Sequence, residues 1–245
     1  MRTGPPLLEL QELRKAFGGV HAVRDLSFTV QEGEILGMIG PNGSGKTTTF
    51  NLITGFFPPD AGRVVLAGEN ITGRPPYDIC RRGVCRTFQL AKPFHDLTVL
   101  RNVTIGSFLG TRDPQEAEAR AWTWLAYVGL EGKARVLAKS LTTIDQRRLE
   151  LARALATEPR LLLLDETMAG LTPHEVVEAV ALIEKIRREG RTLIVVEHVM
   201  RAIMAISDRI IVLDHGSKIA EGKPEQVVAD PHVIRAYLGE GYRRA

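Results

Sequence analysis

Apolar residues along the chain recur with two periods, and the segments that they define alternate between strand and helix. Short apolar or alternating runs predict strands at Leu7–Leu13, Val20–Val30, Ile35–Ile39, Arg63–Leu66, Val84–Phe88, Leu161–Leu164, Thr192–Val196, Arg209–Leu213 and Ser217–Ala220. Apolar residues at helical spacing predict helices at Thr48–Thr54, Tyr77–Arg82, Thr98–Leu109, Pro114–Val128, Lys133–Lys139, Gln146–Thr157, Pro173–Glu189, Val199–Ile206, Glu225–Ala229 and His232–Leu238.

The order of these elements predicts an α/β fold with a mostly parallel sheet, because buried apolar strands alternate with helices. The first two strands, joined through Phe17, Gly18 and Gly19, predict an antiparallel β subdomain at the N-terminus. An all-helical stretch, about 92–140, is interpreted as an inserted helical subdomain. Its core candidates are Trp122, Trp124 and Leu125. The chain 1–245 is then one domain, with a core of 1–91 and 141–245 that ends, from about 209 to 245, in a hairpin and helices.

Composition narrows the classes of protein to which this chain can belong. The 245 residues are 44% hydrophobic, and the net charge of +3 is too small to indicate a nucleic-acid-binding protein. Cys80 and Cys85 lack the spacing of a zinc site, so we expect reduced, structural thiols. No apolar run approaches the roughly 18 residues of a membrane span, and Met1–Pro6 does not resemble a signal peptide. Any membrane role is therefore expected to act through a partner.

The stretch after Ile35–Ile39 fits the phosphate-binding pattern G-x-x-x-x-G-K-[ST]. It consists of Gly40, Pro41, Asn42, Gly43, Ser44, Gly45, Lys46 and Thr47, and Thr48 then opens the predicted helix. The glycines let successive N–H groups point inward, where they and the helix N-terminus suit a nucleoside di- or triphosphate. Lys46 is expected to reach the β- and γ-phosphates, and Thr47 to bind Mg²⁺. The alternative is a glycine-rich turn that binds nothing.

Polar residues at the ends of other predicted strands are further candidates for chemistry. Asp165 fits a carboxylate in the Mg²⁺ shell, and Glu166 is then free to accept a proton from an attacking water. General-base catalysis of this kind contributes about 10²–10⁴ in rate. The alternative is an ordinary acidic pair at a strand end. His198 could hydrogen-bond a γ-phosphate or be structural, and Gln89 alone indicates nothing.

Several segments, in this order and over nearly the whole chain, resemble the ATPase subunits of ABC transporters. They are Gly40–Thr47, Thr87–Gln89, Gln146–Leu155, Leu161–Glu166, Ala169–Thr172 and His198. Four shorter segments look most like the ATPase subunits of branched-chain amino acid importers. These are Phe17–Gly19, Arg86–Gln89, Leu97–Val99 and Met168–Leu171.

The resemblance implies roles for residues that the spacing alone left open. Phe17 stands where the family stacks adenine, and Gln89 stands at the glutamine that touches Mg²⁺ or the attacking water. Asp165 is implied as the Mg²⁺-site acid, Glu166 as the catalytic base and His198 as the switch histidine.

The resemblance also implies a function and partners. An ATPase of this kind binds and hydrolyses ATP, with Mg²⁺, to power a membrane importer, here for branched-chain or related amino acids or small amides. Its partners are integral-membrane permease subunits, a second ABC ATPase subunit in a homo- or heterodimer and, indirectly, a solute-binding protein. Residues 169–172 would cross the dimer seam. The chain is then expected at the cytoplasmic face of the membrane, as a peripheral subunit without a nucleic-acid partner.

Two segments depart from the family pattern. Leu141 is followed by Thr142, Thr143, Ile144 and Asp145, where the family usually has the signature Leu-Ser-Gly-Gly-Gln. In the family this segment touches ATP on the opposite subunit, a contact that Ile144 and Asp145 fit poorly. Thr143 and Gln146 have the spacing of a helix capping box, so the segment could simply cap a helix. The other departure, Thr167 in place of the usual Pro, is expected to be mild.

Two alternatives to a fully active transport ATPase stay open. One is a nucleotide-binding partner in an asymmetric heterodimer with one weak site. The other is a soluble ABC ATPase that does not serve transport. A GTPase is not expected, because the chain has no Asn-Lys-x-Asp segment to read guanine.

Overall fold

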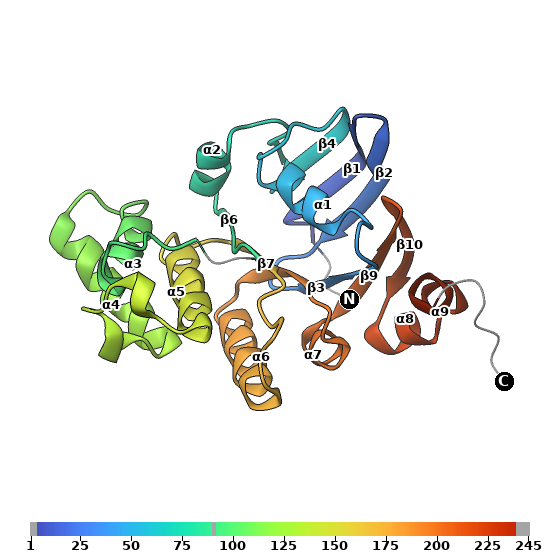
Figure 1. The fold of residues 1–245 in the computed structure, drawn as a ribbon. Coiled ribbons are helices and arrows are strands. Elements are labelled where there is room, and N and C mark those ends of the chain that lie inside the picture. Colours follow the sequence, from blue (N-terminus) through green and yellow to red (C-terminus); the bar gives the residue numbers. More distant parts are fainter. Residues whose placement is uncertain (1–3, 90–91, 239–245) are drawn as a thin grey trace.

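The computed structural model describes residues 4–89 and 92–238, which form two sheets with helices around them (Figure 1). Within this described part, no helix is both long and apolar enough to span a membrane. Two predictions fall partly outside these ranges: the boundary between the core and the helical subdomain at residues 91 and 92, and the part of the C-terminal segment after residue 238.

The smaller sheet is antiparallel, as predicted, with the strand order β2-β1-β4-β5. Its strands are β1 (Leu8–Phe17), β2 (Val20–Val30), β4 (Ala61–Leu66) and β5 (Glu69–Asn70). We expected β1 to end at Leu13, because Arg14 and Lys15 interrupt its apolar pattern. Its backbone nevertheless stays paired with β2 as far as Phe17, through several shifts of register.

The larger sheet has the order β10-β9-β3-β8-β7-β6 and is parallel except for the antiparallel edge strand β10. Its strands are β3 (Ile35–Ile39), β6 (Val84–Arg86), β7 (Leu161–Asp165), β8 (Thr192–Val196), β9 (Arg209–Asp214) and β10 (Ser217–Gly222). Every residue of β3, β7 and β8 is buried, as expected for parallel strands covered on both faces. Because these strands are parallel, the residues that follow them gather at one edge of the sheet.

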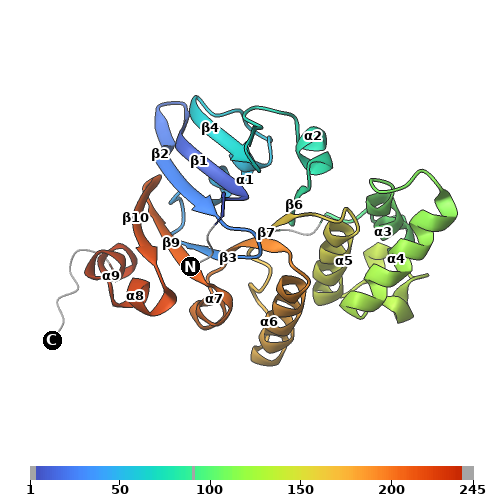
Figure 2. The ribbon, with the colours of Figure 1, turned by 180° about the vertical axis from the view of Figure 1, so that it is seen from behind.

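Helices and the smaller sheet cover the two faces of the larger sheet. On one face, α1 (Lys46–Ile53) and the smaller sheet enclose an apolar cluster that includes Phe50 and Leu163. On the other face lie α6 (Pro173–Arg188) and α7 (Met200–Ile206), as Figure 2 shows from behind. The remaining short helices are α2 (Pro76–Arg81), α8 (Pro224–Ala229) and α9 (Pro231–Leu238).

Three helices form a helical arm beside the larger sheet (Figures 1 and 2). They are α3 (Val99–Ser107), α4 (Pro114–Val128) and α5 (Thr143–Leu155), and α5 packs against the other two. Leu125 is fully buried in α4, as predicted, but Trp122 is 38% exposed, so that core assignment is wrong. The small residues Ala117 and Ala121 fill the buried face instead, because they let neighbouring helices approach closely.

The helix predicted over Lys133–Lys139 is absent. Two short 3₁₀ turns, Glu131–Lys133 and Ala138–Ser140, stand there instead. Between them Leu137 pairs with Thr98 as an isolated β-bridge, and the carbonyl of Val136 accepts a hydrogen bond from the backbone N–H of Val99. The carbonyls that a helix would use internally therefore bind the first turn of α3, a tertiary contact that outweighs local helix propensity.

Candidate nucleotide-binding and catalytic site

The phosphate loop connects the end of β3 with the start of α1, the predicted strand–loop–helix context. Two glycines are required by its geometry. Gly45 has φ 103°, and a Cβ on it would lie 2.4 Å from the carbonyl oxygen of Ala22. A Cβ on Gly40 would lie 2.1 Å from the carbonyl oxygen of Leu213. Side chains at either position would therefore displace neighbouring backbone.

Lys46 lies inside this loop and is almost fully buried. Its ammonium group donates to the carbonyl oxygen of Gly40 at 2.7 Å and to that of Pro41 at 3.0 Å. Burial lowers the pKa of Lys46, whereas the nearby carboxylates Glu166 and Asp165 act in the opposite direction. The loop thus holds a cation whose hydrogen bonds go to neutral oxygens, which suits an incoming phosphate. Thr47, the second residue of α1, is exposed beside it.

Glu166 contacts two other residues that the sequence singled out separately, His198 and Gln89. One oxygen, Oε1, lies 2.6 Å from Nε2 of His198, which follows β8 after one intervening residue. The other, Oε2, accepts a hydrogen bond of 2.6 Å from Nε2 of Gln89. Because an ionised carboxylate only accepts hydrogen bonds, the imidazole of His198 carries its proton on Nε2 when it donates to Glu166. Both carboxylate oxygens are therefore held by groups from neighbouring strand ends.

Asp165 is the last residue of β7 and is 1% exposed. Burial raises its pKa, and the guanidinium of Arg86, 3.0 Å from Oδ2, acts against that shift. Its other oxygen, Oδ1, is buried and has no hydrogen-bond partner among residues 4–89 and 92–238. An unpaired buried carboxylate oxygen beside a phosphate loop fits a Mg²⁺ shell, since this ion prefers carboxylates, hydroxyls and water. Asp165, Thr47 and Gln89 are accordingly the residues that would hold Mg²⁺.

Two charged residues of this region were not predicted as site residues. Arg86 ties Asp165 to Asn51 of α1, which lies 2.5 Å from Nη1. Glu197 is 1% exposed, and its Oε1 accepts from the backbone N–H of Met168 at 2.6 Å. Burial raises the pKa of Glu197, and the hydrogen bond from Met168 opposes that rise. An acid directly after the wholly buried β8 was the available signal for Glu197.

The signature segment caps α5. The hydroxyl of Thr142 accepts a hydrogen bond of 3.3 Å from the backbone N–H of Asp145. The same hydroxyl donates to Oδ2 of Asp145 at 2.7 Å. The expected capping box at Thr143 and Gln146 is therefore wrong by one residue, because α5 begins at Thr143. Asp145 is buried and paired with Lys133, so its charge is already neutralised within the arm. Burial alone would raise the pKa of Asp145, but the bonds from Lys133 and Thr142 hold it below its ordinary value.

Phe17 ends β1 at the turn into β2 and is 42% exposed. Its ring packs edge-on against Phe57, with the centroids 5.2 Å apart. The ring is therefore held in place while part of its surface remains open to solvent.

Comparison with known proteins decides the family. Residues 23–169 match the family model described as ABC transporter, and residues 217–243 match the model described as branched-chain amino acid ATP-binding cassette transporter. The chain belongs to the ABC transporter family. As an ABC ATPase, it couples ATP hydrolysis to transport.

Three similar proteins illustrate the range of relatives of this ABC ATPase. LivG of Escherichia coli (strain K12), a high-affinity branched-chain amino acid transport ATP-binding protein, is 43% identical and covers 96% of this chain and 98% of its own. LptB of the same strain, a lipopolysaccharide export system ATP-binding protein, is 37% identical with the same coverage. A crystal structure of the ADP conformation of an ABC-transporter ATP-binding cassette has a TM-score of 0.87 and 30% identity, covering 97% of this chain and 100% of that one.

Proposed function

We propose that this ABC ATPase binds MgATP on its phosphate loop and hydrolyses it with Glu166 as general base, to power import of branched-chain or related amino acids. The observation that carries the catalytic proposal is the placement of Glu166. Its carboxylate meets His198 and Gln89 at one sheet edge, next to the buried Asp165.

Each residue of the site then has a role in binding or hydrolysing MgATP. The ammonium group of Lys46 leaves the carbonyl oxygens of its own loop and binds β- and γ-phosphate oxygens. The backbone N–H groups of the loop bind the other phosphate oxygens. Glu166 accepts a proton from water as the water oxygen attacks the γ-phosphorus and the bond to ADP breaks. His198 turns its Nε2–H from Glu166 to the γ-phosphate, and Gln89 orients the water. Mg²⁺, held by Asp165, Thr47 and Gln89, would neutralise charge on the phosphates. Phe17 stacks the adenine on its open surface.

The variant Glu166→Gln tests the general-base role. Gln is nearly isosteric and can still form hydrogen bonds, but its amide does not take up the proton of the water. We expect ATP binding within about twofold of wild type and turnover lowered by about 10²-fold or more. Single-turnover hydrolysis with purified chain and MgATP measures this. A wild-type rate in the variant removes Glu166 from that role.

Import of amino acids is favoured over export because two comparisons agree. The identity to LivG exceeds that to LptB, and residues 217–243 match the model described for branched-chain amino acid transporters. Deleting the gene in its host should lower uptake of labelled leucine, isoleucine or valine, and the wild-type chain, but not Glu166→Gln, should restore it. Unchanged uptake of all three would contradict this solute class.

The proposal places the chain at the cytoplasmic face of the membrane, against permease subunits that receive solute from a binding protein. A second ABC ATPase subunit completes each ATP site with its signature segment. None of the hydrogen bonds found within residues 4–89 and 92–238 joins Thr142–Asp145 to the phosphate loop, which agrees with a signature that acts on another subunit. Affinity purification from a detergent extract should recover the permease and reveal whether the second ATPase is a copy or a relative. Recovery without any membrane subunit would contradict the proposed contact with a permease.

A further inference from the structure

The peptide group between Thr167 and Met168, one residue beyond the peptide bond that follows Glu166, is bound at both of its polar ends. Its carbonyl oxygen accepts from Nη1 of Arg147 at 3.1 Å. Its N–H donates to Oε1 of Glu197 at 2.6 Å. The two partners come from different parts of the molecule, because Arg147 lies on α5 of the helical arm and Glu197 follows β8.

The backbone at Glu166 needs such support. Its φ is 51°, in the left-handed region that non-glycine residues rarely adopt. A residue stays in this conformation only when its surroundings hold it there. The backbone N–H of Glu166 donates to the carbonyl of Val196 at 2.9 Å, which fixes the near side of the residue. The peptide bound by Arg147 and Glu197 fixes the far side.

Glu197 is suited to this task by its other contacts. Its Oε1 also lies 3.4 Å from the hydroxyl of Thr167, and Glu197 directly precedes His198 in the chain. One buried carboxylate therefore joins the segment after Glu166 to the residue that contacts Glu166. The hydroxyl of Thr167, which stands where the family usually has Pro, adds a contact that Pro does not offer.

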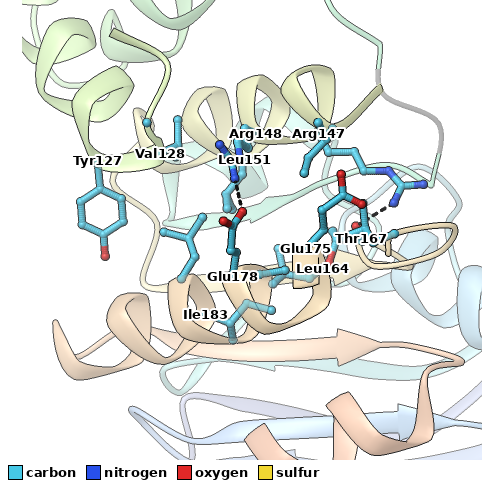
Figure 3. A pocket seen from close by; sticks show the side chains of 15 residues that line it. Tyr127, Val128, Arg147, Arg148, Leu151, Leu164, Thr167, Glu175, Glu178 and Ile183 are labelled. Atoms are coloured by element: carbon cyan, nitrogen blue, oxygen red, sulfur yellow. Dashed lines mark hydrogen bonds and ion pairs between the residues drawn. The ribbon is translucent and has the colours of Figure 1, made fainter. Parts of the chain in front are cut away.

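Arg147 lines a pocket between α5 and α6 that is partly open to solvent. A cavity of about 300 Å³ separates α5 from α6 and is lined mainly by apolar side chains, including Leu151 and Ile183. Figure 3 shows Arg147 and Arg148 at its edge, with Arg147 bonded to Thr167 and Arg148 to Glu178. Arg147 therefore links α5 directly to the segment after Glu166, whereas Arg148 links α5 only to α6.

We infer that Arg147 and Glu197 are positioning residues that clamp the peptide group between Thr167 and Met168. The position of the signature helix α5 then determines the orientation of the Glu166 carboxylate. The inference rests on the general-base role of Glu166 proposed above. A clamp of this kind acts on the chemical step and leaves the phosphate loop, which binds the nucleotide, untouched.

The first test compares Arg147→Ala with Arg148→Ala in the full chain. Both variants lose a guanidinium from the same helix and the same cavity, but only Arg147 contacts the peptide. We expect Arg147→Ala to lower kcat about tenfold to a hundredfold with KM for MgATP within about twofold, because small misplacements of catalytic groups cost this much. Arg148→Ala should retain kcat within about twofold. Equal losses in the two variants, or a loss confined to KM, would overturn the clamp.

The second test uses Glu197→Gln and Glu197→Ala, and guards against failure to fold. Gln keeps an oxygen for the N–H of Met168, so it should restore most of the kcat that Ala loses. The double variant Arg147→Ala/Glu197→Ala should lose less than the product of the single losses, because both act on one peptide. Independent, multiplicative losses contradict a shared clamp. Glu166→Gln serves as reference: if it turns over normally the base role fails, whereas an inactive Glu166→Gln beside a fully active Arg147→Ala rejects the clamp alone.

Discussion

At the scale of single residues, the ammonium group of Lys46 is held by carbonyl oxygens of its own loop. These neutral acceptors compensate only part of the hydration that burial removes, which is why its pKa is lowered. A phosphate brings full negative charge to the same place, so binding replaces weak partners by stronger, charge-assisted ones.

We therefore expect Lys46→Ala to weaken ATP binding by about tenfold to more than a hundredfold, the equivalent of roughly 1.5–3 kcal/mol for a charge-assisted hydrogen bond. Calorimetric titration with ATP measures the affinity. Lys139→Ala is the matched control, because Lys139 is exposed and pairs with Asp96, and neither residue belongs to the phosphate loop. Equal affinities in Lys46→Ala and wild type would mean that the loop does not bind phosphate through this lysine.

Glu150 supplies a pH-dependent contribution to stability. Burial raises its pKa to about 7, above the ordinary value, although its Oε1 accepts from the N–H of Phe88 at 2.8 Å. A carboxyl whose folded pKa exceeds its unfolded pKa stabilises the fold most below the unfolded value, and this contribution is lost as pH rises through about 7. Wild type should therefore lose stability relative to Glu150→Gln between pH 5 and pH 8, by about 2–3 kcal/mol. Urea unfolding of both proteins across this range measures the difference, and parallel curves would contradict it.

The site was predictable to the extent that its chemistry is local. The phosphate loop is one contiguous motif, and Asp165, Glu166 and His198 follow apolar strands whose ends must meet at one sheet edge. Arg86 and Glu197 were not predicted, because their roles depend on partners more than 20 residues away that no spacing reveals. The catalytic roles themselves, including those of Gln89 and Phe17, stay predictions that the variants must test.

At the scale of elements, the signature helix α5 illustrates how a departure from a family pattern is accommodated. Asp145, which looked unfavourable near a triphosphate, pairs with Lys133 inside the helical arm. Thr142 uses its hydroxyl as the cap of the helix. The N-terminus of α5 is therefore well formed. Its first turn carries branched side chains at positions where the family usually has glycines.

Replacing Thr142-Thr143-Ile144-Asp145 by Ser-Gly-Gly-Gln should raise ATP turnover of the purified homodimer about tenfold, or about 1.4 kcal/mol of transition-state stabilisation. The replacement also removes the partner of Lys133, so some stability should be lost. Lys133→Ala, which breaks the same pair and keeps the signature residues, separates the two effects in a turnover assay and a thermal melt. Unchanged turnover in the replacement, with a wild type that is already fast, would show the variant signature to be fully competent.

The elements themselves were predictable where periodicity was strong and uninterrupted. The buried strands β3, β7 and β8 and the long helices α4 and α6 begin and end close to their predicted positions. The segment around Val136 was not, because its backbone carbonyls bind α3 and tertiary pairing replaced the helix. The larger sheet, the antiparallel sheet and the helical arm agree with the predicted α/β class.

At the scale of the whole molecule, the chain carries one complete phosphate loop and one atypical signature, and these belong to different ATP sites in the proposed dimer. The division into a core and a helical subdomain with its boundary at about 140 stays a prediction, and α5, beyond that boundary, packs on α3 and α4. An asymmetric pair with a related ATPase would place a better signature opposite Lys46 and Glu166.

In that case the chain alone should hydrolyse ATP slowly, and adding the copurified ATPase partner should raise turnover about tenfold or more. Glu166→Gln in this chain should then remove most of the stimulated activity, because the stronger site is built on its phosphate loop. The same substitution at the equivalent acid of the partner should remove less. Equal losses from both substitutions would indicate two equivalent sites.

The peptide N–H of Met168 also offers a way to observe the molecule at work. Both tryptophans, Trp122 and Trp124, lie on α4, so intrinsic fluorescence reports on the helical arm and not on the catalytic segment. A buried amide hydrogen held by Glu197 exchanges with deuterated water only when that bond opens. Its exchange rate, read by mass spectrometry of a peptide spanning residues 166–171, therefore times the opening of the segment between the signature helix and the switch histidine, without any label in the site.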